Sequence, residues 1–179
     1  EWPSASPNIV SAGGTSTVHN PVTGAFEGSI AWQSGGGGPS AYERRPRYQN
    51  SVASSVGGMR GTPDLTFDAD PDTGVWIYDT TPYEFLDFPP AGIQTVVIGW
   101  TPVGGTSVSS PSLSGIVNVA GRFAMSSAAE LSLMYSNLGN NRAFLDVNYG
   151  TCGPYEGYFA ASGWDFCTGI GTDSGLFGK

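Results

Sequence analysis

Ser107 is the residue of this chain whose surroundings best suit nucleophilic chemistry. It lies in the segment Gly105-Thr106-Ser107-Val108-Ser109-Ser110-Pro111, after an apolar, β-branched run and before apolar residues at helical spacing. This order predicts a strand, a tight glycine turn and a helix that begins near the serine. Free backbone N–H groups at a helix N-terminus can stabilise an oxyanion. A Thr-Ser pair is more commonly a helix N-cap, but the two glycines and Pro111, which suits the first turn of a helix, favour a nucleophile.

The other residues that could do chemistry give weaker patterns. Cys152 and Cys167 are the only cysteines, and an even number in an exported chain favours a disulfide, with two buried thiols as the alternative. Their spacing does not fit a Cys-x-x-Cys zinc or redox site. The single histidine, His19, lies in a turn sequence that does not orient an imidazole, so we do not expect a Ser-His triad.

Four acidic residues follow one another closely: Asp64, Asp68, Asp70 and Asp72. The spacing of the last three resembles the start of an EF-hand loop. However, Gly74 occupies position 7 rather than 6, and position 12 carries Asp79 rather than glutamate. We therefore interpret the cluster as a solvated turn between strands.

The elements that must position these residues are short. The 179 residues include 27 glycines and 13 prolines, which indicates many tight turns. We expect strands at Asn8–Ala12, Ser29–Trp32, Gly74–Thr80 and Ile93–Gly99, and helices at about Arg47–Val56, Ser107–Arg122 and Ala128–Leu138. The pair Ser127…Glu130 predicts a capping box for the third helix.

Composition excludes several classes of function. The net charge of −8 and a pI near 4.3 disfavour binding to nucleic acid or anionic membranes. The chain has no run of 18 apolar residues, so its sequence predicts no membrane span. An acidic medium would protonate carboxylates and relieve the self-repulsion, so we expect a secreted protein or one in an acidic, lysosome-like compartment.

Five ordered motifs resemble those of the sedolisins, the serine-carboxyl peptidases that include the tripeptidyl peptidases. The nucleophile segment matches the family's Gly-Thr-Ser-x-Ser-Ser-Pro and lacks the Met-Ala-x-Pro-His continuation of subtilisins. The motifs are Pro3–Pro7 with Val10–Thr15, Ser34–Gly37 with Arg45–Gln49, Arg60–Leu65 with Asp68–Pro71, Gly105–Pro111, and Asp146–Val147 with Gly163–Gly171. The resemblance implies that residues 1–179 are the C-terminal half of a subtilisin-like α/β catalytic domain, with a parallel sheet flanked by helices.

The resemblance also implies a function. Ser107 would attack peptide bonds to form an acyl-enzyme, with Thr106 and the Ser107 N–H beside the oxyanion. In the family a glutamate base, its partner aspartate and an oxyanion aspartate precede the Pro3–Pro7 motif, so we expect an N-terminal chain of the same precursor to supply them. A cut piece or an inactive remnant would have the same sequence. A glutamate stays partly ionised in acid, where a histidine would be protonated and unable to accept the serine proton.

The resemblance further implies a calcium site in the tail, about residues 144–171. Asp146 and Asp165 would supply carboxylates, and Val147, Ala161 and Gly163 would supply carbonyl oxygens. An oxygen-only shell suits Ca²⁺. Ala161 stands where the family often has glycine, and a carbonyl ligand requires no particular side chain.

A rival interpretation from another class is a catalytically silent binding chain. It would use its tryptophans as platforms for carbohydrate or peptide: Trp2, Trp32, Trp76 and Trp100. Scattered tryptophans more often belong to a core.

Overall fold

A five-stranded mixed sheet forms the centre of the protein in a computed structural model, which describes residues 2–86, 94–154 and 157–178. The strand order is β2-β1-β5-β11-β8. These strands are β1 (Ala12–His19), β2 (Phe26–Ala31), β5 (Leu65–Asp68), β8 (Phe144–Leu145) and β11 (Thr172–Asp173).

The three central strands run parallel and the two edge strands run antiparallel to them. The prediction of a parallel sheet therefore holds for β1, β5 and β11 but not for the edges. For β2 the reason is connection length, because β2 follows β1 after a short turn, and such a turn joins only antiparallel strands.

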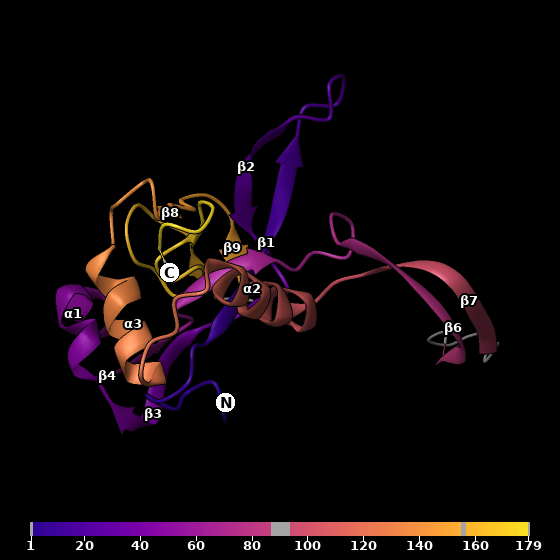
Figure 1. Cartoon of the computed structure of the whole chain (residues 1–179). Coiled ribbons are helices and arrows are strands. Elements are labelled where there is room, and N and C mark those ends of the chain that lie inside the picture. Colours follow the sequence, from indigo (N-terminus) through magenta and orange to yellow (C-terminus); the bar gives the residue numbers. More distant parts are fainter. Residues whose placement is uncertain (1, 87–93, 155–156, 179) are drawn as a thin grey trace.

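Smaller elements surround this sheet. An antiparallel pair, β3 (Gly38–Arg44) and β4 (Met59–Thr62), lies beside the short helices η1 (Arg47–Val52) and α1 (Ala53–Val56) (Figure 1). Near the C-terminus, β9 (Thr151–Cys152) pairs with β10 (Tyr158–Phe159).

A long hairpin extends away from the body of the molecule (Figure 1). It consists of β6 (Val75–Leu86) and β7 (Gln94–Val103), which pair antiparallel. The predicted strands at Gly74–Thr80 and Ile93–Gly99 correspond to this hairpin, with Ile93 outside the described residues. The end of β7 leads through Gly104 and Gly105 into the next helix.

Two longer helices cover the sheet and its neighbours. Helix α2 (Thr106–Ala120) packs against β1 and β5, and α3 (Ser127–Ser136) packs against η1. The buried Ser109 hydroxyl donates to the Gly13 carbonyl (2.7 Å) and fixes the first turns of α2 to β1. The three predicted helices are confirmed within a few residues.

Local details differ from expectation in two places. Helix α3 is capped by Ser126, whose Oγ accepts from the Ala129 N–H (3.2 Å), and not by Ser127. The strand predicted at Asn8–Ala12 is wrong except for Ala12, because Asn8 and Ile9 lie in a turn in which the Ile9 N–H donates to the Ser6 carbonyl (3.4 Å).

The main hydrophobic core lies between the sheet and the helices α1, α2 and α3. Its buried members come from every part of the chain: Val52, Val56, Leu65, Leu113, Leu131, Met134, Tyr135, Ala143, Phe144, Trp164 and Ile170. In the described part of the chain, no helix is long and apolar enough to cross a membrane.

Candidate active site and calcium site

Ser107 occupies the second position of α2, and its side chain is exposed to solvent. Two glycines create this placement. Gly105 has a φ of +82°, a conformation that side chains rarely adopt. A Cβ on Gly104 would lie 2.5 Å from the Pro71 nitrogen, so only glycine lets the turn pack this closely. The strand, glycine turn and helix predicted from the sequence are therefore confirmed.

Free backbone donors lie at the start of the helix that carries Ser107. The first N–H groups of a helix have no acceptor within it, and at the start of α2 they belong to Thr106 and Ser107. The next donor, the Val108 N–H, bonds to the Gly105 carbonyl (2.9 Å). Pro111 is the sixth residue of the helix, so the expectation that it occupies the first turn is wrong. It leaves the Ser107 carbonyl without the usual i+4 donor.

Ser107 has no hydrogen-bonded base among the residues described. Within residues 2–86, 94–154 and 157–178, no hydrogen bond joins the Ser107 hydroxyl to a carboxylate or an imidazole. The ring nitrogens of His19 contact the Gly24 carbonyl (3.2 Å) and Thr17 Oγ1 (3.0 Å), both in its own hairpin. His19 is thus the last residue of β1 rather than part of a turn, and its ring is held by its own hairpin.

The acidic segment after β5 forms a hydrogen-bonded turn. Asp70 Oδ2 accepts from the Ser16 hydroxyl (2.6 Å), and Asp68 Oδ1 accepts from the Thr73 hydroxyl (2.8 Å). Burial and the nearby charge of Asp70 raise the pKa of Asp68, and the hydrogen bond from Thr73 lowers it by less. The interpretation as a solvated turn holds for Asp72, which is exposed in a turn. It is wrong for Asp68, the last residue of β5, and for Asp64, which is completely buried.

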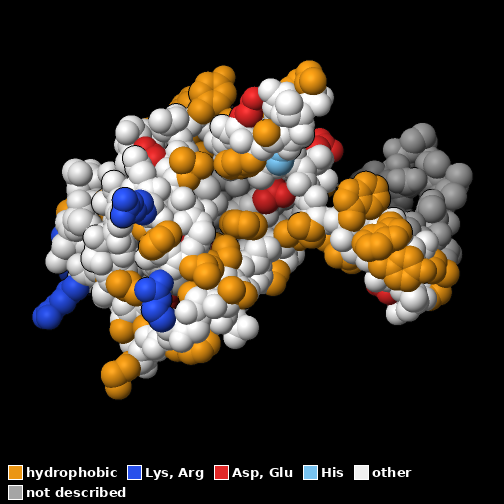
Figure 2. Space-filling model, turned by 45° about the horizontal axis from the view of Figure 1, so that its top comes forward, with side chains coloured by type: hydrophobic (Ala, Val, Ile, Leu, Met, Phe, Trp, Pro, Cys, Tyr) orange, Lys and Arg blue, Asp and Glu red, His pale blue; other side chains and the backbone are white. Residues whose placement is uncertain are grey.

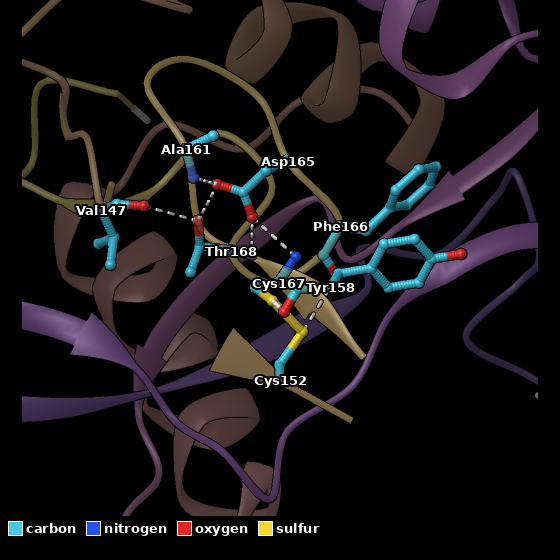
Figure 3. Close-up of a disulfide and its surroundings, with 8 residues drawn as sticks. All are labelled: Val147, Cys152, Tyr158, Ala161, Asp165, Phe166, Cys167 and Thr168. Atoms are coloured by element: carbon cyan, nitrogen blue, oxygen red, sulfur yellow. Dashed lines mark hydrogen bonds between the residues drawn. A yellow bond between two sulfur atoms is a disulfide. The ribbon is translucent and has the colours of Figure 1, made fainter. Parts of the chain in front are cut away.

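In the predicted calcium tail, Asp146 and Asp165 hold one irregular loop. Asp146 Oδ2 accepts from the Gly163 N–H (3.0 Å). Asp165 Oδ1 accepts from the N–H groups of Cys167 (2.7 Å) and Thr168 (2.9 Å) (Figure 3). Its Oδ2 accepts from the Ala161 N–H (3.0 Å) and the Thr168 hydroxyl (3.1 Å). Burial raises the pKa of Asp165, and these bonds act in the opposite direction.

The loop also brings the residues predicted to supply carbonyl ligands next to these carboxylates. The Val147 carbonyl accepts from the Thr168 hydroxyl (3.2 Å), the same hydroxyl that contacts Asp165 (Figure 3). Ala161 and Gly163 are each bonded through their N–H to one of the two aspartates.

One observation tests whether this donor set fits a cation. Asp146 Oδ1 is buried and, in the described part of the chain, has no hydrogen-bond partner. An unpaired buried carboxylate oxygen is costly, and a bound cation would satisfy it. The described residues contain no group of three or more His, Cys, Asp or Glu side chains suited to a metal, so carbonyl oxygens would have to complete the shell. Carboxylate and carbonyl oxygens fit Ca²⁺.

Cys152 and Cys167 form a disulfide, which confirms that prediction over two free thiols. The bond joins β9 to the loop that carries Asp165 (Figure 3). It therefore anchors this loop to the rest of the tail, of which residues 155 and 156 lie outside the described part.

The sequence and the fold were compared with those of known proteins. No protein-family model matches the chain. Sedolisin from Pseudomonas sp. (strain 101) is 33% identical in an alignment of 184 positions, which covers 96% of this chain and 28% of that protein. The solved structure of Pseudomonas sedolisin, a serine-carboxyl proteinase complexed with two molecules of pseudo-iodotyrostatin, aligns with a TM-score of 0.72 at 31% identity. That alignment covers 97% of this chain and 45% of the solved one. This chain is a homologue of the sedolisins.

Two further relatives give the same result. Xanthomonalisin from Xanthomonas sp. (strain T-22) is 32% identical over 95% of this chain and 21% of its own length. Kumamolisin from Bacillus sp. (strain MN-32) is 29% identical over 98% of this chain and 31% of its own length. The chain thus spans less than a third of the length of these sedolisin-type proteins, and it corresponds to a C-terminal portion of sedolisin.

A buried polar network explains one sedolisin-like motif whose role the sequence did not show. Arg60 and Asp64, at the two ends of Arg60-Gly-Thr-Pro-Asp64, are both fully buried and form an ion pair with an N–O distance of 2.5 Å. Asp64 also accepts from the Ser11 N–H (2.8 Å) and the Tyr135 hydroxyl (2.9 Å). The i, i+4 spacing of opposite charges was the available signal, but nothing local indicated burial.

The same network reaches the calcium loop. The Tyr135 hydroxyl accepts from Gln49 Nε2 (2.6 Å) and from Trp164 Nε1 (3.2 Å), and Trp164 lies between Gly163 and Asp165. Burial raises the pKa of Tyr135 well above its usual value, so the phenol remains protonated and keeps its donor bond. The core of this sedolisin homologue therefore positions the loop of the candidate calcium site.

Proposed function

We propose that this chain carries the nucleophile of an acid-acting serine-carboxyl peptidase of the sedolisin type. The observation that carries the proposal is the exposed Ser107 hydroxyl at the second position of α2, after the Gly104-Gly105 turn. Homology to sedolisin across 96% of the chain gives this serine its chemical context.

In the proposed reaction, Ser107 Oγ attacks the carbonyl carbon of a peptide bond while its proton passes to a carboxylate base. The developing oxyanion lies beside the backbone N–H groups of Thr106 and Ser107, where the positive end of the helix stabilises negative charge. The amine then leaves with a proton, and water hydrolyses the acyl-enzyme. Substrates are peptides or proteins, cleaved internally or as N-terminal tripeptides.

The base is proposed to come from an N-terminal portion of the same precursor. That portion would supply a glutamate, its partner aspartate and an aspartate at the oxyanion. Two observations support this division. The chain spans 28% of sedolisin, and within its described residues Ser107 has no carboxylate or imidazole partner. A serine hydroxyl without a base is a weak nucleophile, so this chain alone would be inactive.

We also propose that the tail binds Ca²⁺. Asp146 and Asp165 would hold the ion together with the carbonyl oxygens of Val147, Ala161 and Gly163. The unpaired Asp146 Oδ1 and the anchoring of the loop by the disulfide support this assignment. Bound calcium would hold the loop in place by joining its two carboxylates.

The proposed location is outside the cell or in an acidic compartment. The disulfide suits an oxidising environment, and the net charge of −8 suits a medium in which some carboxylates are protonated.

A silent binding chain remains the second candidate function, because one observation favours it. On the β6–β7 hairpin, Trp76 and Trp100 are 63% and 66% exposed, contrary to the expectation that tryptophans belong to the core. Hydrophobic side chains gather on this projecting hairpin (Figure 2). A Trp76→Ala, Trp100→Ala double variant that loses peptide binding, in a protein that never hydrolyses peptides, would favour this candidate.

The deciding experiment replaces Ser107 in the native protein that contains this chain. Ser107→Ala should lower kcat by several orders of magnitude with little change in the thermal unfolding midpoint. Ser110→Ala, one helical turn further along α2 and also exposed, is the matched control and should keep its activity. Near-normal turnover by Ser107→Ala would refute the assignment.

A further inference from the structure

A pocket of about 330 Å³ lies between α2, α3 and the start of β1. Most of its wall is apolar, formed by Val10, Ala12, Leu113, Val117, Phe123 and Met134. Among the described residues that line it, Ser107 is absent, so the pocket is separate from the proposed nucleophile. Its volume lies at the lower end of the range for small-ligand pockets, about 300–1,000 Å³.

Glu130 is the only charged residue among the described residues that line this pocket. It stands in the first turn of α3, and its side chain is only 8% exposed. Its Oε1 is buried and has no hydrogen-bond partner within the described part of the chain. The sequence predicted that Glu130 would close a capping box with Ser127, but the N-cap is Ser126 and the carboxylate lies against the pocket instead.

Two neighbouring polar groups are used elsewhere. The Ser114 hydroxyl, also in the lining, donates to the Ser110 carbonyl of its own helix (3.0 Å). Arg122 precedes Phe123 in the sequence, yet its Nη2 donates to the Leu176 carbonyl (2.7 Å). The carboxylate of Glu130 therefore lacks a counter-ion from these neighbours.

A buried carboxylate oxygen without a partner is unfavourable, and a ligand that pairs with it would recover that free energy. Apolar walls select an apolar stem, and the single carboxylate selects a positive charge at its end. We propose that this pocket binds a primary ammonium or guanidinium group carried on an apolar stem, with Glu130 as its counter-ion.

Two sources could supply this chemistry. One is a free alkylamine or alkylguanidine, and the other is a lysine or arginine side chain of a polypeptide. Both have a stem of several methylene groups and a terminal cation, so the probes must separate them.

The test titrates the native protein that contains this chain with three probes that share one stem: n-hexylammonium, 1-hexanol and hexanoate. Binding is followed at pH 7 by ¹⁵N NMR at the amides of Leu113, Val117 and Met134. Hexylammonium should bind at least tenfold more tightly than hexanol, and hexanoate should bind more weakly than hexanol. Equal affinities for hexylammonium and hexanol, or shifts confined to other parts of the chain, would overturn the proposal.

Glu130→Gln supplies the second measurement, because it keeps the shape of the side chain and removes the charge. It should abolish the tenfold preference for hexylammonium and leave hexanol binding unchanged. Glu27→Gln removes an exposed carboxylate on β2 and should behave as the wild type. Should Glu130→Gln fail to fold, the three-probe comparison on the wild type still decides the question.

A peptide arm identifies the source of the cation. Acetyl-Ala-Leu-Lys-Leu-Ala-amide is compared with the same peptide carrying norleucine in place of lysine. Tighter binding of the lysine peptide than of hexylammonium assigns the pocket to a polypeptide side chain, and binding of hexylammonium alone assigns it to a small amine. Each readout is independent of peptidase activity.

Discussion

Replacing Tyr135 with phenylalanine removes one oxygen atom at the centre of the buried network. The hydroxyl donates to Asp64 Oδ1 (2.9 Å) and accepts from Gln49 Nε2 (2.6 Å) and Trp164 Nε1 (3.2 Å). Gln49 keeps a second acceptor in the Gly61 carbonyl (2.8 Å), whereas the indole N–H of the buried Trp164 is left unpaired.

The loss of stability in Tyr135→Phe can be worked out from these contacts. A hydrogen bond to a charged group contributes about 1.5–3 kcal/mol, and an unsatisfied buried donor costs about 1–3 kcal/mol. The two effects share one atom and do not add fully, so Tyr135→Phe should lower the free energy of unfolding by about 3–4 kcal/mol. For a chain of this size, each kcal/mol lost from the free energy of unfolding lowers the melting temperature by about 2–4 °C, so Tyr135→Phe should lower it by about 10 °C.

The assay is urea and thermal unfolding at neutral pH, followed by circular dichroism and tryptophan fluorescence. Tyr48→Phe is the matched control, because it removes the same atom from a half-buried tyrosine with one bond, to the Pro7 carbonyl (2.9 Å). It should cost about 1 kcal/mol. If Tyr135→Phe costs no more than Tyr48→Phe, the network does not have the role inferred here.

Three further predictions concern the metal, the base and the acidic turn. Chelation of calcium, or Asp146→Asn in its presence, should lower the melting temperature, because an ion that binds only the native state stabilises it; a native protein that contains no calcium by elemental analysis would exclude the site. The kcat/KM of the native protein should rise as pH falls below about 6, since a carboxylate base operates in acid, and a plateau extending through pH 8 would indicate a histidine base. The pKa of Asp68 is raised in the folded state, so its protonated form stabilises the fold, and this contribution is lost as pH rises from about 4 through the native pKa. Asp68→Asn should therefore flatten the pH dependence of the urea midpoint over that range, and an unchanged dependence would contradict this reasoning.

Sequence reasoning succeeded where the determining signals are local. The start of α2 follows from Gly105 and the apolar spacing after Ser107, whereas its end was predicted two residues late, because Gly121 ends the helix in the left-handed conformation. The exposed position of Ser107 at the start of that helix was predictable for the same reason. The disulfide needed only the count of cysteines and an expected oxidising environment.

It failed where the determining contacts are distant in the sequence. β1 begins at Ala12 because it pairs there with Leu65 of β5, which no pattern near Asn8 reveals. Asp64 was interpreted as solvated, yet Tyr135, 71 residues later, completes its buried environment. Glu130 was expected at a helix cap, and its burial depends on the packing of α3 beside α2 and β1.

The most direct test of the central claim is to trap the acyl-enzyme. The native protein is mixed at about pH 4 with a slowly hydrolysed peptide ester, quenched in strong acid, digested and mapped by mass spectrometry. The account predicts a mass increase equal to the acyl group on the peptide that contains Ser107, and none in Ser107→Ala. Rapid hydrolysis with no acyl group on that peptide, or an acyl group on another residue, would contradict it.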